Sequence, residues 1–263
     1  MKTSKLLIIV LLLGLTAVAG CGRKEEATAP AEPAAGGNAA SAATPFDPAK
    51  GTAAVSGKVA FEGTVPPAGE IKMNADAACV ALHKEPVKSE EVLVADGKLQ
   101  NVFVYVKEGL EKYTFPAPTS SATINQEGCH YSPHVGGIMV GQELSIINSD
   151  PTLHNIHCWA EKNKQFNIGQ PMKGMETKQK FTVPEIMIHF KCDVHKWMSS
   201  YLGVLTHPYY GVTGKDGAFA IKNLPPGDYV IEAWHEKFGA QTQKVTVADK
   251  DSKELSFTFK ATS

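Results

Sequence analysis

The chain has 263 residues, with 26 basic and 27 acidic side chains and a formal net charge of −1 at pH 7. This balance, without a long run of one sign, gives no support for a nucleic-acid partner. The length accommodates one or two folded domains after a terminal targeting segment. Motifs for a nucleophile elbow, a phosphate-binding loop, a zinc-protease helix or haem attachment do not occur, and we expect a protein that is not an enzyme.

The N-terminus has the order of an export signal. Lys2 and Lys5 precede an apolar run over residues 6–13, which is too short to span a bilayer comfortably. Small residues then lead directly to Cys21, which resembles a bacterial lipoprotein signal. We therefore expect residues 1–20 to be a signal peptide and Cys21 to be lipidated, with the protein on the periplasmic side of a bacterial membrane or at the cell exterior. The alternative is an ordinary secretory signal with an incidental cysteine.

Residues 21–52 are rich in Ala, Pro, Gly and Ser and show no apolar periodicity. Such a segment cannot bury enough apolar surface to offset the entropy of ordering it. We expect a flexible linker that tethers the folded part to the membrane.

The remaining residues, 53–263, are typical of short strands separated by turns. Residues 102–106 are apolar at every position, as in a strand covered on both faces, and residues 255–259 alternate. Asp-Gly turns at 96–97 and 216–217 and a Pro-Pro-Gly turn at 225–227 recur between such runs. Short strands with frequent turns predict an all-β protein built from sandwiches.

The centre of the sequence carries one motif that points to metal chemistry. Cys192, His195 and Met198 supply a thiol, an imidazole and a thioether within seven residues, and His154 lies upstream. Two His, one Cys and a weak Met form the ligand set of a mononuclear blue-copper site. We therefore predict one type 1 copper held by these four residues, with His157 as an alternative to His154.

The strand before this motif supports the role of its cysteine. Alternation places residues 186, 188, 190 and 192 on one apolar face and residues 187, 189 and 191 on the other. A buried structural cysteine would show the same pattern. The ligand role is favoured because His195 and Met198 follow where the chain must turn.

The other cysteines are few. Export implies an oxidising compartment, so Cys79 and Cys129 could pair as a disulfide, which leaves Cys158 without an assigned role. Cys129 also stands near His130 and His134. A second metal site there is less favoured than a disulfide cysteine with two surface histidines.

The ordered set of His154, Cys192, His195 and Met198 resembles the small cupredoxins, and the C-x2-H-x2-M spacing is closest to the amicyanin type. The resemblance implies a Greek-key sandwich and these four copper ligands. It also implies that Asn155 ties the two ligand loops together. Electron transfer with redox protein partners is the function that it implies.

In such cupredoxins the second-loop histidine, here His195, reaches the surface through an apolar patch. Trp197, with Pro151 and Leu153 from the other loop, could build that patch and serve in docking. The alternative is that Trp197 packs into a seam between two modules.

The C-terminal part carries a second resemblance. Residues 217–231 are a strand, a Pro-Gly turn and a strand, and resemble the carboxypeptidase regulatory-like domain, a small transthyretin-like sandwich. Residues 55–61 resemble the opening strand of that family. We expect residues 53–115 with 208–263 to form this sandwich and residues 116–207 to form an inserted cupredoxin. The alternative is a tandem arrangement, 53–206 and 207–263.

The expected function is that of a membrane-tethered periplasmic protein that carries single electrons between redox partners. The alternative is a non-redox module for binding a carbohydrate or a protein, or for storing copper. Colour separates the two, because a Cu(II)–thiolate centre absorbs visible light strongly and a Cu(I) store does not.

Overall fold

The structure is a computed structural model that describes residues 43–261. The expected signal peptide, the lipidated Cys21 and most of the expected linker lie outside the described residues. Within residues 43–261, no helix has the length and apolar character needed to cross a membrane.

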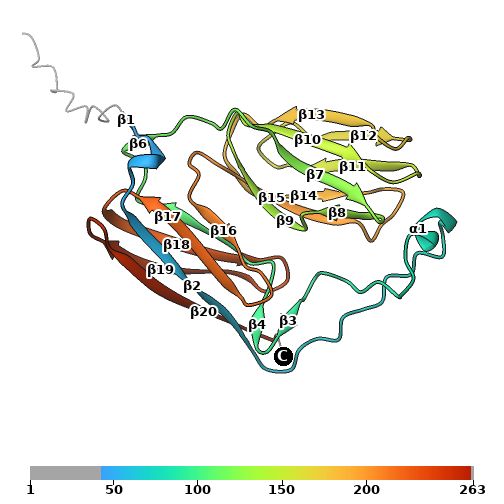
Figure 1. Cartoon of the computed structure of the whole chain (residues 1–263), viewed down its shortest axis with the longest axis horizontal. Helices are drawn as coiled ribbons and strands as arrows, with labels where there is room; N and C mark the ends of the chain where they lie inside the picture. Colours follow the sequence, from blue (N-terminus) through green and yellow to red (C-terminus); the bar gives the residue numbers. More distant parts are fainter. Residues whose placement is uncertain (1–42, 262–263) are drawn as a thin grey trace, which may run out of the picture. The chain divides into compact units, whose positions relative to one another are not determined.

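The described chain is nearly all β-strand, which confirms the predicted fold class (Figure 1). Two pairs of sheets account for most of the strands. The central sheets have the orders β13-β10-β7-β8 and β12-β11-β14-β15-β9. Their strands are β7 (Ala122–Glu127), β8 (His130–Ser132), β9 (Val135–Met139), β10 (Glu143–Asn148), β11 (His154–Trp159), β12 (Phe166–Gln170), β13 (Glu176–Lys180), β14 (Glu185–Lys191) and β15 (Ser199–Leu205).

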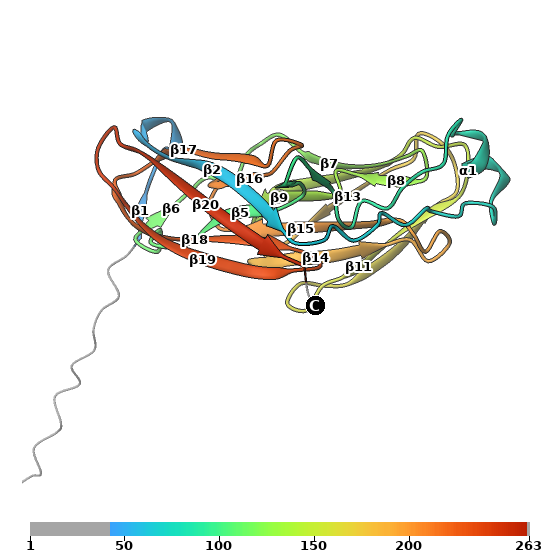
Figure 2. The same ribbon diagram turned by 90° about the horizontal axis from the view of Figure 1, so that it is seen from below.

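The flanking sheets come from the sequence on both sides of the central ones. Their orders are β16-β5-β18-β19 and β17-β2-β4-β3, with β20 pairing in parallel with β2. Their strands are β2 (Ala53–Glu62), β3 (Val94–Ala95), β4 (Lys98–Leu99), β5 (Phe103–Glu108), β16 (Tyr210–Val212), β17 (Ala218–Leu224), β18 (Gly227–His235), β19 (Gly239–Val247) and β20 (Ser252–Lys260). Figure 2 shows β18 and β19 on one side of this pair and β2 and β17 on the other. Whether each pair of sheets folds as a separate domain stays a prediction.

Each pair encloses its own apolar core. In β2 every second residue is buried, because successive side chains of a strand point to opposite faces. Val55, Leu99 and Ile231 belong to the core of the flanking sheets. Ile146 and Phe190 belong to the core of the central sheets.

Strand β5 is buried on both faces, as its apolar sequence predicts. Val104 and Val106 point into the core of the flanking sheets. Phe103 and Tyr105 join a separate cluster that also contains Val135 of the central sheets. A second contact joins the two pairs of sheets, because the Tyr210 hydroxyl donates to the Gly137 carbonyl at 2.6 Å.

The described part of the predicted linker contains regular structure. β1 (Thr44–Pro45) pairs with β6 (Tyr113–Thr114), and a 3-10 turn, η1, follows at Pro48–Lys50. The ring of Phe46 lies 5.0 Å from that of Tyr113, between centroids. Residues 43–52, assigned to the linker from composition, therefore contact the folded part through β1 and Phe46, although none of them is buried.

The predicted alternation in β14 is wrong at one residue. Ile188, Phe190 and Cys192 are buried, but Ile186 is exposed. The register shifts between Glu185 and Ile188, and Met187 has a positive φ of 58°. A bulge inserts an extra residue and reverses which face the preceding side chain occupies.

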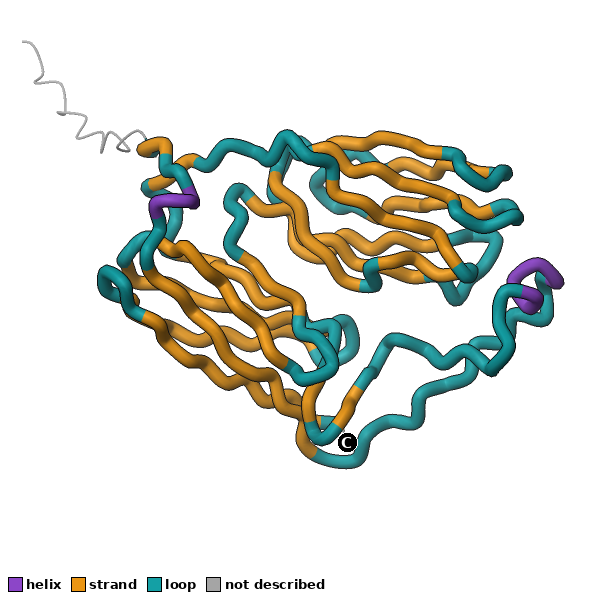
Figure 3. The backbone as a smooth tube through the Cα atoms, in the orientation of Figure 1, coloured by secondary structure: helices purple, strands orange, loops and turns teal. Residues whose placement is uncertain are grey.

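A long excursion between β2 and β3 leaves the flanking sheets. Figure 3 shows it as loop except for one short helix, α1 (Ala77–Ala81). Its base is closed by a bridge between Glu70 and Lys88 and by the Ile71 N–H, which donates to the Val87 carbonyl at 2.8 Å. We call residues 70–88 the cap. Met73 and Cys79 of the cap belong to the core of the central sheets, although their sequence position had assigned them to the other sandwich.

Candidate metal centre

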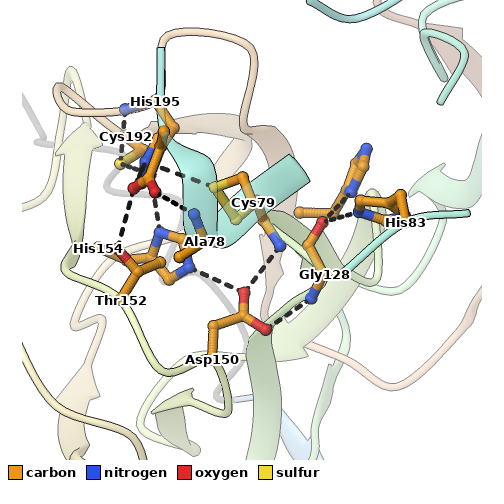
Figure 4. The surroundings of a disulfide bond; sticks show 12 residues. Ala78, Cys79, His83, Gly128, Asp150, Thr152, His154, Cys192 and His195 are labelled. Atoms are coloured by element: carbon orange, nitrogen blue, oxygen red, sulfur yellow. Dashed lines mark hydrogen bonds and ion pairs between the residues drawn. A yellow bond between two sulfur atoms is a disulfide. The ribbon is translucent and has the colours of Figure 1, made fainter. Parts of the chain in front are cut away.

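Three side chains converge at one end of the central sheets. His154 Nδ1 lies 2.9 Å from His195 Nδ1, and Cys192 Sγ lies 3.9 Å from the same His195 nitrogen. All three residues are at most 2% exposed. One ligand atom from each lies within 4.8 Å of the others, so the group could hold a metal ion (Figure 4).

Two strand ends position this group. His154 opens β11, and Cys192 follows the last residue of β14. A tight turn returns the chain to β15: the Met198 N–H donates to the His195 carbonyl at 2.9 Å, and the Cys192 N–H donates to the Met198 carbonyl at 3.3 Å. Met198 is buried in the core of the central sheets. The turn therefore brings the predicted thiol, imidazole and thioether residues together.

Two carboxylates hold the outer nitrogens of the imidazoles. His154 Nε2 lies 2.9 Å from Asp150 Oδ2, and His195 Nε2 lies 2.9 Å from Asp76 Oδ2. An acceptor at Nε2 keeps the proton on that nitrogen and leaves the Nδ1 lone pair free for a metal. Sequence reasoning missed both carboxylates. The Asn-Ser-Asp-Pro turn before His154 was a usable signal for Asp150, whereas no local signal pointed to Asp76.

The charges of the three converging side chains and of their carboxylate partners suit a bound cation. Two Nδ1 lone pairs facing each other at 2.9 Å repel unless a proton or a metal lies between them. Burial opposes protonation of His154, but its hydrogen bonds with Asp150 and Cys192 outweigh burial and raise the pKa to about 9. The pKa of Asp76 is lowered to about 2, chiefly by its hydrogen bond with His195. The buried donors therefore match a metal with nitrogen and sulfur ligands.

Asn155 connects the two ligand segments, as the resemblance implied. Its Oδ1 accepts the Asp193 N–H at 2.6 Å and the Cys192 thiol at 3.3 Å. The His195 N–H in turn donates to Cys192 Sγ at 3.2 Å. Burial opposes ionisation of Cys192, but a hydrogen bond with His154 and backbone N–H donors, among them that of His195, hold the pKa of the thiol below its usual value.

The alternative first ligand does not enter the group. His157 Nδ1 lies 3.1 Å from Asp193 Oδ2, and its side chain is partly exposed. Cys158 is buried in the core, where burial raises the pKa of its thiol to about 12. It is an apolar packing residue rather than part of the site.

The cap covers the site where the resemblance implied an exposed histidine. Cys79 and Cys129 form a disulfide, and Cys79 Sγ lies 3.6 Å from His195 Nε2. His195 is therefore buried and does not reach the surface. Trp197 is half-buried: its indole N–H donates to the Cys129 carbonyl at 3.0 Å, and its ring lies 5.0 Å from that of His195. Its role in docking stays a prediction.

Comparison with known proteins gives one family match, to the carboxypeptidase regulatory-like domain over residues 205–260. No curated protein sequence matches the chain. Among solved structures, an amicyanin variant in the Cu(I) form is 20% identical, with a TM-score of 0.29, and 32% of this chain and 81% of that chain are covered.

Two further solved structures show a similar likeness. A purple cupredoxin from Nitrosopumilus maritimus is 23% identical with a TM-score of 0.28, covering 32% of this chain and 98% of that one. A copper-containing nitrite reductase from Thermus scotoductus SA-01 is 15% identical with a TM-score of 0.30, covering 56% of this chain and 28% of that one.

Proposed function

We propose that the protein is a carrier of single electrons, with one type 1 copper bound by His154, Cys192, His195 and Met198. The observation that carries the proposal is the convergence of His154 Nδ1, His195 Nδ1 and Cys192 Sγ within 4.8 Å in a buried site. Two imidazoles, one thiolate and a distant thioether suit both Cu(I) and Cu(II), so that little reorganisation accompanies a change of one electron.

The surrounding residues keep the donors in place for this role. Asp150 and Asp76 fix the orientation of the two imidazole rings through Nε2. The Asn155 side chain and the His195 N–H hold the cysteine sulfur through hydrogen bonds, and the one from His195 favours its thiolate. Burial of all three donors excludes water from the site.

We place the electron's exit beside the cap rather than through His195. Leu153 and Val194 are exposed apolar side chains, 42% and 49% accessible, and each neighbours one of the two histidines in sequence. A redox partner that makes a weak, short-lived complex needs only a small contact area. These two residues are the proposed contact.

The cellular setting follows from the sequence alone. We propose a lipid anchor at Cys21 that holds the protein on the periplasmic side of a membrane or at the cell exterior. The sandwich that resembles the carboxypeptidase regulatory-like domain then acts as a scaffold or a binding module. We propose no catalytic reaction for the protein.

The test is copper titration followed by visible and electron paramagnetic resonance spectra. We expect one Cu(II) per chain and an intense visible band, which Cys192→Ser abolishes. Cys158→Ser, at the other buried thiol, should leave the band in place. A Cys192→Ser protein that stays coloured would contradict the assignment.

A second candidate function is storage of Cu(I), and the cap favours it because it buries His195. A store binds copper without a visible band and does not exchange electrons with a redox mediator. Cyclic voltammetry of the copper-loaded protein separates the two functions, because only the electron carrier gives a reversible one-electron wave.

A further inference from the structure

The disulfide of the cap lies against the outer side of both imidazoles (Figure 4). One ligand atom each from Cys79, Asp76 and His195 lies within 4.8 Å of the others. The same holds for Cys129, Asp150 and His154. Each sulfur of the bridge therefore faces one imidazole–carboxylate pair, and the electron-carrier proposal gives neither sulfur a role in metal binding.

The chain is synthesised with both cysteines as thiols, and the bridge forms only on later oxidation. In the folded protein the two Cα atoms lie 5.7 Å apart and both side chains are buried. Before oxidation, two soft sulfur ligands thus stand side by side. Thiolates select Cu(I) over harder ions.

We propose that Cys79 and Cys129, when reduced, bind a second copper as Cu(I), directly outside the group of His154, Cys192 and His195. Two Cu–S bonds form and each thiol loses one proton, while copper and sulfur keep their oxidation states. Thiol–disulfide exchange with the disulfide of another protein, which is itself reduced to two thiols, converts the pair to its disulfide and so removes both thiolates and with them the site. The redox state of this cysteine pair therefore sets the number of copper ions that the chain holds.

The surroundings of the pair suit a cation with thiolate ligands. His195 Nε2 lies 3.6 Å from Cys79 Sγ, close enough to stabilise negative charge on that sulfur. Asp76 and Asp150 place one carboxylate oxygen each near the sulfurs, within 4.8 Å of Cys79 and Cys129 respectively.

The test is anaerobic titration with Cu(I) against a chromogenic Cu(I) chelator, on the full chain carrying Cys21→Ser so that this thiol does not contribute. A phosphine reductant converts the disulfide to two thiols, with one water consumed and the phosphine oxide formed. We expect two Cu(I) per chain after reduction and one with the disulfide intact. The double variant Cys79→Ala, Cys129→Ala should bind one in both states, and Cys158→Ala should behave as the parent.

Cys192→Ser separates this inference from the proposed function. It weakens the inner group and keeps the outer pair, so the reduced variant should bind one Cu(I), with two sulfur ligands in X-ray absorption. The inference is overturned if that variant binds no Cu(I), or if reduction adds no Cu(I) to the number that the parent binds with its disulfide intact. It is also overturned if reduction abolishes the near-ultraviolet circular dichroism and Cu(I) does not restore it.

Discussion

The two imidazoles of the site have the same hydrogen bond to a carboxylate, but the carboxylates come from different distances along the chain. Asp150 stands four residues before His154, is buried, and also accepts two backbone N–H groups. Asp76 stands 119 residues before His195, on the cap, and its side chain is 25% exposed. Both nitrogen–oxygen distances are 2.9 Å.

His154 and Asp150 therefore form a half of the site that is built locally, whereas His195 and Asp76 form a half that is built by tertiary contact. The Asp150 half depends on the turn between β10 and β11, where the Asn148 side chain donates to the Thr152 carbonyl at 2.9 Å. The Asp76 half depends on the cap, which the disulfide joins to the central sheets. Loss of the cap should therefore affect one histidine and spare the other.

The largest expected effect comes from removing the link between the cap and the central sheets. The double variant Cys79→Ala, Cys129→Ala frees a loop of 50 residues. We expect the free energy of unfolding to fall by about 4 kcal/mol, because the closed loop no longer restricts the unfolded chain. Denaturant unfolding measures it.

Hydrogen exchange locates this effect. The cap amides should exchange faster in the double variant, while the amide of Cys129, which donates to Asp150, stays protected. Cys158→Ala, which removes a buried thiol without breaking a bridge, should cost only about 1 kcal/mol. Equal losses in the two variants would show that the disulfide does not hold the cap.

The local half is tested by Asp150→Asn. The amide cannot accept hydrogen bonds from both Gly128 and Cys129 while it accepts one from His154, so a buried donor is left unpaired. We expect copper affinity to fall by about 100-fold, the upper range for partners of a metal-binding histidine. Competition with a chelator measures the affinity, and Asp216→Asn, in an exposed turn, is the control.

The tertiary half is tested by Asp76→Asn, with a smaller expected effect. Asn still caps α1 through its oxygen, where the Ala78 N–H donates to Asp76 Oδ1 at 2.7 Å, and its site is partly solvated. We expect a loss of copper affinity of about 10-fold. Thr152→Val removes only the hydroxyl that donates to Asp76 and should have less effect. A loss as large as that of Asp150→Asn would remove the distinction between the halves.

The smallest expected effect concerns a buried histidine that has no carboxylate partner in its hydrogen bonds. His207 donates from Nε2 to the Val106 carbonyl at 2.9 Å, and burial lowers its pKa to about 4. A histidine whose pKa is lower in the folded protein than in the unfolded chain, where it is near 6.5, adds to the free energy of unfolding at pH values above 6.5. This contribution is lost as the pH falls toward 4.

We therefore expect the copper-free protein to lose about 1 kcal/mol through His207 between pH 7 and pH 5.5. His207→Gln should lose less over this range than the parent does, as measured by denaturant unfolding at each pH. A parallel decline in parent and variant would show that His207 is already charged in the folded protein.

The convergence of His154, Cys192 and His195 could be predicted because the parts of this group are encoded within short stretches of chain. Cys192, His195 and Met198 lie in one turn between two strands, and strand alternation places Cys192 on the buried face. His154 and Asn155 open the neighbouring strand. The all-β class followed from the same local patterns, since turns and alternation recur along the whole folded part.

The position of the cap over the site could not be predicted, because no local pattern relates Asp76 to His195 across 119 residues. The pairing of Cys79 with Cys129 was foreseen, but nothing in either segment showed that the bridge would lie over an imidazole. The burial of His195 follows from that placement. The sequence by itself determined which donors lie together, because backbone geometry acts locally; tertiary structure decided what covers them, because packing joins segments that are distant along the chain.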